Sequence, residues 1–240
     1  MLLPIDELLL ACLAVTLGAT LQASTGFGAG LVSVPLLALI RPELVPGPIL
    51  LASLLMTFGT ACKHRGGIIK DHLSMVFLGL FVGAVGGALL VAQVECERLS
   101  TVLGIVILAA IAVSIAGVKI KLSGSNAFLA GTLAAVMGAT GGTGGTLLAL
   151  FSQHEQGQRI RATLALLYFC GTVLILVMLF AAGRFGAQEL VFGLQLIPGF
   201  LLGYGIAKPI AKFLDRGYAR TVLLAVSTTS VFILIGQSLG

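Results

Sequence analysis

The stretch "GATGGTGGTLLALF", from Gly138 to Phe151, places five glycines among eight residues inside an otherwise apolar segment. Glycine is a poor helix former, and each one costs about 1 kcal/mol in a helix interior relative to alanine. A similar stretch, "TGFGAGLVSVPLLAL", begins at Thr25, 115 residues before Thr140. Both stretches predict a break in a helix.

The composition identifies the environment in which these breaks occur. The 240 residues are 58% hydrophobic and 10% charged, with a mean hydropathy of +1.12, which is outside the range of soluble domains. Apolar runs near the length of about 20 residues that crosses a bilayer are Val45–Cys62, Leu73–Val94, Leu99–Val118, Ile160–Ala182, Leu190–Ala207 and Val222–Gly236. We therefore expect an all-α polytopic membrane protein with about eight helical membrane segments.

Several classes of function are disfavoured by the motifs. The four cysteines lack CxxC spacing, so neither a metal site nor a redox pair is expected. "GGTGG" is not followed by Gly-Lys-Ser/Thr, and GxSxG and HExxH patterns are missing from the sequence. The net charge of +5 comes from basic residues between apolar runs, not from a nucleic-acid-binding patch. The expectation is a protein that is not an enzyme and has no cofactor and no nucleic-acid partner.

Further matches at a similar offset suggest a duplicated chain. Gly83 and Gly87 in "GAVGG" recur as Gly199 and Gly203 in "GFLLG", 116 residues later, and "TVL" at residue 101 recurs at residue 221. Two halves, residues 1–122 and 123–240, would form one transmembrane domain with pseudo-twofold symmetry, as in many secondary transporters. We interpret the glycines spaced by four in these segments as helix-packing positions.

The segment before the last three spans of each half allows two topologies. If it crosses the membrane, the repeats are parallel and the basic residues divide eight to six between the two faces. If it re-enters as a hairpin, the repeats are inverted; Arg41, Arg98 and Arg184 lie on one face and the other eleven basic residues on the other. The positive-inside rule favours the second arrangement. We expect inverted repeats, each a broken or re-entrant helical hairpin plus three transmembrane helices, with both termini outside.

The two glycine loops are the candidate binding site. Irregular backbone at membrane depth is tolerated where it is buried in protein or lines a wet cavity, and a helix N-terminus offers free N–H donors to an anion. The predicted substrate-binding residues are Gln22, Ser24, Thr25, Gly26, Phe27, Gly28, Ala29, Gly30, Ser53, Thr140, Gly141, Gly142, Thr143, Gly144, Gly145, Thr146 and Thr163. The alternatives are that the loop glycines only permit helix packing, and that the Ser53 and Thr163 hydroxyls bond to their own helices.

The motifs "GFGAGLVSVPLLAL", "GGTGGTLLALF", "RGGI", "LGLFVGAVGGALL" and "PGFLLGYGIAKPIAKFL" resemble the TauE/SafE family of sulfite-exporter-like membrane proteins across essentially the whole length. The resemblance implies transport of small sulfur-containing or organic anions, such as sulfite, thiosulfate or sulfoacetate, across the bacterial cytoplasmic membrane, with protons as the candidate coupling ion. The chain departs from the family pattern at Leu150, which stands where the first copy has Pro35, and at Phe27 and Ala29, where the family often has glycine.

The leading hypothesis is an anion transporter that holds its substrate at the bilayer midplane. Gly144→Leu is expected to abolish transport without loss of expression. A passive channel or a membrane subunit of a larger complex is the alternative. The substrate, the direction of transport and the oligomeric state are open, with a homodimer as one option.

Overall fold

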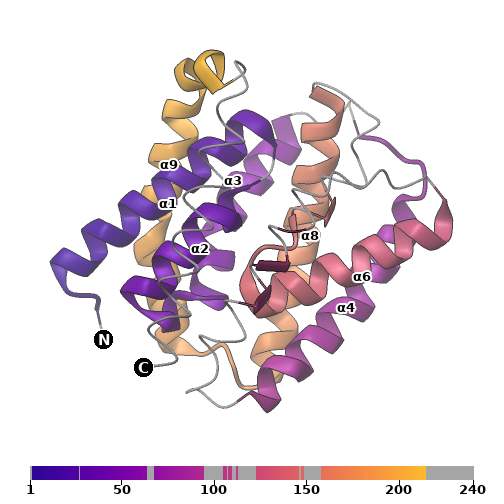
Figure 1. Cartoon of the computed structure of the whole chain (residues 1–240), viewed down its shortest axis with the longest axis horizontal. Helices are drawn as coiled ribbons and strands as arrows, with labels where there is room; N and C mark the ends of the chain where they lie inside the picture. Colours follow the sequence, from indigo (N-terminus) through magenta and orange to yellow (C-terminus); the bar gives the residue numbers. More distant parts are fainter. Residues whose placement is uncertain are drawn as a thin grey trace.

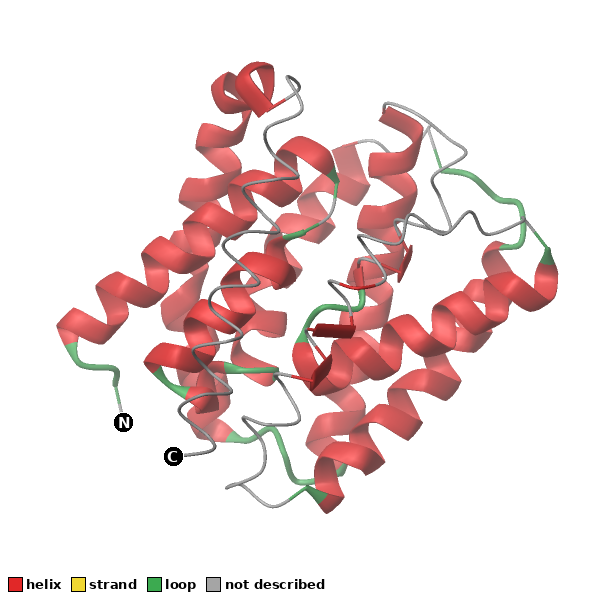
Figure 2. Cartoon of the chain, viewed as in Figure 1, coloured by secondary structure: helices red, strands yellow, loops and turns green. Residues whose placement is uncertain are grey.

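The chain is all-α where its structure is described. The computed structural model describes residues 2–26, 28–63, 68–94, 123–145, 147–148 and 158–214, together with residues 105, 106, 108, 109 and 112. Within these residues there are helices and loops and no strand (Figures 1 and 2). The elements are α1 (Ile5–Thr25), α2 (Ala29–Ile40), the short 3-10 helix η1 (Pro42–Leu44), α3 (Gly47–Lys63), α4 (Leu73–Gln93), α6 (Gly124–Gly141), α8 (Gln158–Ala181) and α9 (Ala187–Leu214).

Five candidate membrane spans lie in the described part of the chain, in α1, α3 with η1, α4, α8 and α9. Four of the predicted apolar runs coincide with α3, α4, α8 and α9 and are thereby confirmed as helices of membrane-spanning length. The predicted run Leu99–Val118 lies mostly outside the described residues, and Val222–Gly236 lies wholly outside them. The protein is therefore a multi-pass membrane protein.

Both predicted helix breaks occur at glycines with left-handed backbone. The φ angles are 94° at Gly26, which ends α1, and 64° at Gly142, which ends α6. Each of these N–H groups donates to the carbonyl four residues earlier, at 2.7 Å from Gly26 to Gln22 and at 2.8 Å from Gly142 to Gly138. Glycine adopts positive φ without the steric penalty that a Cβ would bring, so the sequence can stop a helix within an apolar segment here.

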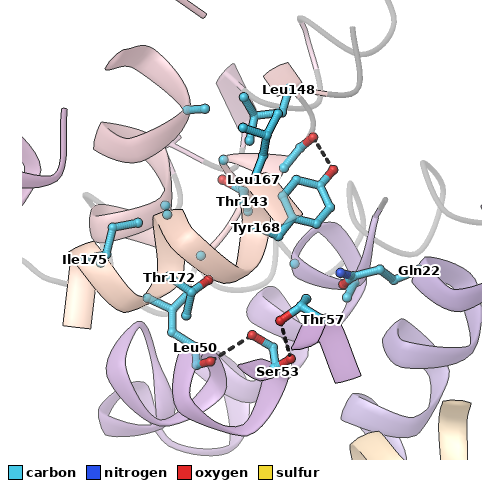
Figure 3. A pocket seen from close by; sticks show the side chains of 18 of the residues that line it. Gln22, Leu50, Ser53, Thr57, Thr143, Leu148, Leu167, Tyr168, Thr172 and Ile175 are labelled. Atoms are coloured by element: carbon cyan, nitrogen blue, oxygen red, sulfur yellow. Dashed lines mark hydrogen bonds between the residues drawn. The ribbon is translucent and has the colours of Figure 1, made fainter. Parts of the chain in front are cut away.

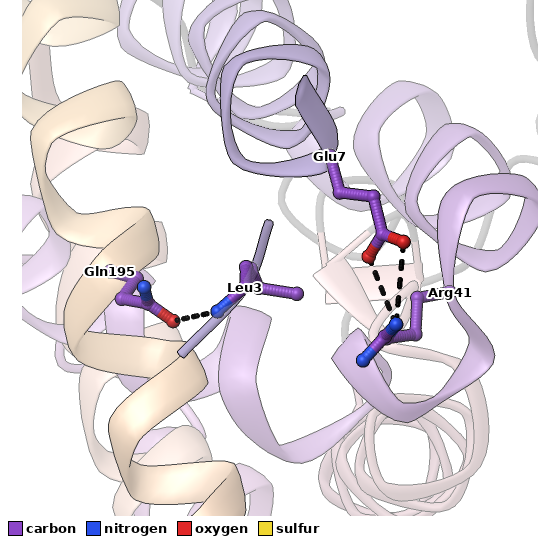
Figure 4. A network of polar contacts seen from close by, with 4 residues as sticks. All are labelled: Leu3, Glu7, Arg41 and Gln195. Carbon is purple, nitrogen blue, oxygen red and sulfur yellow. Dashed lines mark hydrogen bonds and ion pairs between the residues drawn. The ribbon is translucent and has the colours of Figure 1, made fainter. Parts of the chain in front are cut away.

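The first break folds α1 and α2 into an antiparallel hairpin. At its open end, Arg41 Nε lies 3.0 Å from a carboxylate oxygen of Glu7 (Figure 4). Nearer the tip, the Ser33 hydroxyl donates to the Ala14 carbonyl at 2.9 Å, and Gly18 leaves the space that this serine occupies. With 12 residues, α2 is about 18 Å long, too short to cross a hydrocarbon core of about 30 Å.

Two parallel helix pairs, α4 with α6 and α1 with α9, form the scaffold. A Cβ at Gly83 on α4 would collide with the Thr132 carbonyl of α6, and one at Gly203 on α9 with the Thr16 carbonyl of α1. The other glycines of this pattern that face a partner helix are Gly79, Gly87 and Gly199. Their predicted role in close helix packing is confirmed, because only a residue without a side chain allows these backbones to approach so closely.

Hydroxyl groups also join α1 to α9. Three hydroxyls spaced by four residues on α1 donate to three carbonyls spaced by four on α9: Thr16 to Gly199 at 3.1 Å, Thr20 to Gly203 at 3.2 Å, and Ser24 to Ala207 at 3.4 Å. Each hydroxyl also donates to the carbonyl four residues earlier in α1, so the bonds are three-centred. Such hydrogen bonds between helices contribute about 0.6 kcal/mol each on average in membrane proteins.

The buried apolar residues form two cores, and each core combines helices from both halves of the chain. One core contains residues of α1, α2, α3 and α9, and the other contains residues of α4, α6 and α8. Figure 1 shows them as two groups of helices, with the first group on the left and the second on the right. The α3 helix contacts both α9 and α8, so the seam between the two cores runs along α3 and α8.

Candidate functional site

A cavity of about 80 Å³ lies at the seam between the two cores (Figure 3). Residues 28–31 at the start of α2 and residues 142–145 after α6 form part of its wall. The rest comes from α3, α4, α6 and α8, together with Gln22, Leu148 and Phe200. A buried water needs on the order of 10–15 Å³, so the cavity is large enough for one small polyatomic ion.

The two glycine loops meet at this cavity. A Cβ at Gly30 would collide with the carbonyl oxygen of Gly142 and would lie 3.2 Å from the Cα of Thr143. Glycine at position 30 thus allows the start of α2 to contact the backbone of the second loop directly. Residues 30 and 142, which are 112 positions apart in the sequence, are brought into one site in this way.

The predicted residues divide into three groups. Those that line the cavity are Gln22, Gly28, Ala29, Gly30, Ser53, Gly142, Thr143, Gly144 and Gly145. Those that lie away from its described lining are Ser24, Gly26, Thr140, Gly141 and Thr163. Phe27 and Thr146 are outside the described residues, as is the side chain of Thr25.

The hydroxyls that lie away from the cavity have other partners. Ser24 takes part in the contact between α1 and α9, and the Thr140 hydroxyl donates to the Val136 carbonyl at 2.8 Å. Thr163 accepts a hydrogen bond from the Ile69 N–H at 2.9 Å and thereby fixes the connection before α4 to the start of α8. These hydroxyls are thus engaged within the protein, and Thr163 also donates to the carbonyl four residues earlier in its own helix, which was the alternative interpretation.

Thr143 is a buried polar residue with a hydroxyl that is unpaired among the described residues. Its side chain is 2% exposed, and its hydroxyl has no hydrogen-bond partner among the described residues. Leaving a buried hydroxyl unpaired costs about 1–3 kcal/mol, so such groups are rare in native proteins and require an explanation. Thr143 lines the cavity, which makes its unpaired hydroxyl a candidate contact for a bound ligand.

The start of α2 supplies a second source of donors. Its N-cap residue is Gly28, with a φ angle of 101°, and no side chain of the described residues caps the helix. The first turn of a helix has N–H groups without internal partners and a partial positive charge of about half a unit. Gly28, Ala29 and Gly30 line the same cavity as Thr143.

Three polar lining residues were not predicted from the sequence: Thr57 on α3 and Tyr168 and Thr172 on α8. The Tyr168 hydroxyl donates to the Gly145 carbonyl at 2.7 Å, and the Thr57 hydroxyl donates to the Ser53 carbonyl at 3.0 Å. The sequence contained a signal for two of them, because Thr57 and Thr172 stand 115 residues apart, which is the offset between Thr25 and Thr140. The same offset leads from Ser53 to Tyr168 rather than to the predicted counterpart, Thr163.

The family of the chain follows from its match to known proteins. The family model "Sulfite exporter TauE/SafE" matches residues 10–234, nearly the whole chain. The chain belongs to the TauE/SafE family. No curated protein and no solved structure matches it. TauE/SafE proteins form a transporter family, so the cavity between the two glycine loops lies in a membrane protein of the sulfite-exporter type.

Proposed function

We propose that this TauE/SafE protein is a secondary transporter that binds a small sulfur-containing or organic anion between its two glycine loops. Sulfite, thiosulfate and sulfoacetate are the candidate substrates, and protons are the candidate coupling ion. The observation that carries the proposal is the buried hydroxyl of Thr143, which has no partner among the described residues, beside the start of α2, which no described side chain caps. Both groups are donors, which is the chemistry that an anion requires.

The character of the lining supports a site built from neutral groups. None of the described lining residues is Lys or Arg; the polar side chains are Gln22, Ser53, Thr57, Thr143, Tyr168 and Thr172. Hydroxyls and backbone N–H groups can stabilise an anion without the strong attraction of a buried cation. A transporter must release its substrate, and a site of this kind allows both binding and release.

The directions of the helices support the inverted repeats. The helices α4 and α8 start together, where Ile69 N–H donates to Thr163, and end together, where Arg184 donates to the Val94 carbonyl at 2.6 Å. A short connection reverses the chain between α8 and α9 (Figure 1). Because α6 is parallel to α4 and α1 is parallel to α9, α1 runs opposite to α6, as expected for inverted repeats that each begin with a re-entrant hairpin.

Labelling of introduced cysteines tests this topology. In a cysteine-free background, Asp71→Cys is expected to react with a membrane-impermeant maleimide from the cytoplasmic side, and Ala187→Cys from the outside. Both positions are exposed, Asp71 in the connection before α4 and Ala187 at the first residue of α9. Parallel repeats would place the two on the same side of the membrane, so reaction of both from one side contradicts the inverted arrangement and the external location of the termini.

The position of the cavity supports alternating access. It lies between the two cores, where α2 and α3 of one face α6 and α8 of the other. Relative rotation of the two cores about the contact between α3 and α8 would open the cavity first to one side of the membrane and then to the other. In this proposal the two cores move relative to each other. Each core contains helices from both sequence repeats.

Thr143→Val is the experiment that tests the proposed site. Valine keeps the shape of threonine but cannot donate, so the affinity for the substrate is expected to fall about 10- to 100-fold, the value of one hydrogen bond to a charged group. The measurement is thermal stabilisation of the purified protein by sulfite, sulfate, thiosulfate, sulfoacetate and small carboxylates. Thr60→Val is the matched control, because the Thr60 hydroxyl bonds to the Met56 carbonyl of its own helix and does not line the cavity.

Two outcomes would contradict the proposal. If none of these anions stabilises the wild-type protein, the substrate class is wrong. If Thr143→Val and Thr60→Val bind the anion equally well, the site lies elsewhere. Flux that does not saturate in proteoliposomes would instead favour the alternative function, a passive channel.

A further inference from the structure

Tyr168 and Gly145 fit one another closely at the edge of the cavity. A Cβ at Gly145 would lie 2.9 Å from Cζ of the Tyr168 ring, so a side chain at position 145 would displace this ring. The Tyr168 hydroxyl donates to the Gly145 carbonyl at 2.7 Å (Figure 3). The neighbouring carbonyl, of Gly144, accepts a hydrogen bond from the Leu147 N–H at 3.2 Å. The two carbonyl groups that follow Thr143 are thus both engaged within the protein.

These bonds matter for an anion because a free carbonyl oxygen would repel it. The Tyr168 hydroxyl neutralises one such oxygen and holds the turn in which the Thr143 hydroxyl stays unpaired. Tyr168 lies on α8, 23 residues after Gly145 in the sequence. Tyr168 is therefore a positioning residue for the second loop.

The first half of the chain has a pair of residues that corresponds to Gly145 and Tyr168, but with serine in place of tyrosine. Gly30 and Ser53 are also 23 residues apart, and each stands 115 residues before its counterpart, Gly145 or Tyr168. Both members of this pair line the cavity. The Ser53 hydroxyl bonds within its own helix, to the Leu50 carbonyl at 2.8 Å. Serine is much smaller than tyrosine, and the Ser53 hydroxyl bonds to its own helix, whereas the Tyr168 hydroxyl bonds to a glycine loop.

We propose that Tyr168 determines the specificity of the site by filling one of two related half-sites, so that a single small anion binds in the other half, against Ser53 and the start of α2. The inference rests on the proposed function. It predicts an upper size for the substrate, set by the Tyr168 ring, and a single binding site per chain despite the duplicated loops.

The experiment uses a series of sulfonates of increasing length. Sulfite, methanesulfonate, ethanesulfonate and propanesulfonate are tested by thermal stabilisation of the purified full-length protein. Tyr168→Ser is expected to admit at least one longer sulfonate that the wild-type protein rejects. Tyr168→Phe retains the ring and is expected to keep the wild-type size limit with affinity about tenfold weaker. Ser53→Tyr is expected to lose anion binding. Tyr204→Phe on α9, which lies outside the described lining, is the matched control and is expected to behave as wild type.

The outcomes separate this inference from the proposed function. If no anion stabilises the wild-type protein or Tyr204→Phe, the proposed function fails. If the wild-type protein binds sulfite but Tyr168→Ser keeps the same size limit, the specificity role of Tyr168 is wrong. If Tyr168→Ser does not fold, Ser53→Tyr and Tyr168→Phe test the inference. Wild-type binding by Ser53→Tyr overturns the inference, and loss of binding by Ser53→Tyr together with an unchanged size limit in Tyr168→Phe supports it.

Discussion

Gly30→Ala is expected to abolish anion binding and transport. The added methyl group would collide with the Gly142 carbonyl and would come within 3.2 Å of the Thr143 Cα, so the two loops must separate. Overpacking of this kind typically costs about 1–3 kcal/mol of stability. The larger effect is on function, because Thr143 and the start of α2 would no longer line one cavity together. The measurements are sulfite-dependent thermal stabilisation and substrate flux in proteoliposomes.

Gly59→Ala is the control for this prediction. Gly59 lies on α3, and no atom of the described residues lies within 4 Å of the place its Cβ would take. Alanine is also the better helix former, so this variant is expected to retain both binding and flux. Wild-type flux in Gly30→Ala would show that the contact between the two loops is not needed for transport.

Gly83→Val is expected to cause the largest loss of stability. Its Cβ would collide with the Thr132 carbonyl, and backbone atoms cannot move aside as the end of a flexible side chain can. The helices α4 and α6 would have to separate along a seam that Gly79 and Gly87 also close. We expect a loss of about 3 kcal/mol or more in the free energy of unfolding.

Denaturation of the purified protein in mixed micelles measures this loss. Gly86→Val, three residues along the same helix, adds the same side chain where no described atom lies within 4 Å. This control separates the intrinsic effect of valine in a helix from the effect of the collision. Equal stability of the two variants would contradict the role of Gly83 in packing.

Much of the fold could be predicted because its determinants are local in the sequence. Hydropathy alone located α3, α4, α8 and α9, and the low helix propensity of glycine located the ends of α1 and α6. The spacing of Gly199 and Gly203 indicated a packing face, since residues four apart lie on one side of a helix. Which helix that face contacts was not predictable, because the partner, α1, is distant in the sequence.

Only the backbone part of the site, the two glycine loops, could be predicted from the sequence. The glycine loops are marked by composition, and most of their described residues line the cavity. Whether a hydroxyl on a helix faces the cavity depends on the rotation of that helix against its neighbours. Ser24 therefore faces α9, while Thr57 and Thr172, which sequence reasoning passed over, line the cavity.

Gly144→Leu does not test the site alone. A Cβ at Gly144 would collide with the backbone carbonyl of Ala134, so Gly144→Leu disturbs the contact between the second loop and α6 as well as the site. The expectation that this variant loses transport without loss of expression does not fit such a contact. Thr143→Val removes a single hydroxyl and tests the site alone.

Because each core contains helices from both halves of the chain, its helices are not all synthesised at the same time. The polar face of α1, with Thr16 and Thr20, is matched by α9, which the ribosome produces about 183 residues later. At a synthesis rate of about 5–20 residues per second, α1 waits roughly 10–40 s for this partner. During this time its hydroxyls face lipid or a helper protein of the insertion machinery. A chain that stops before α9 would leave that face uncovered, which gives the quality control of the cell a feature by which unfinished copies can be recognised.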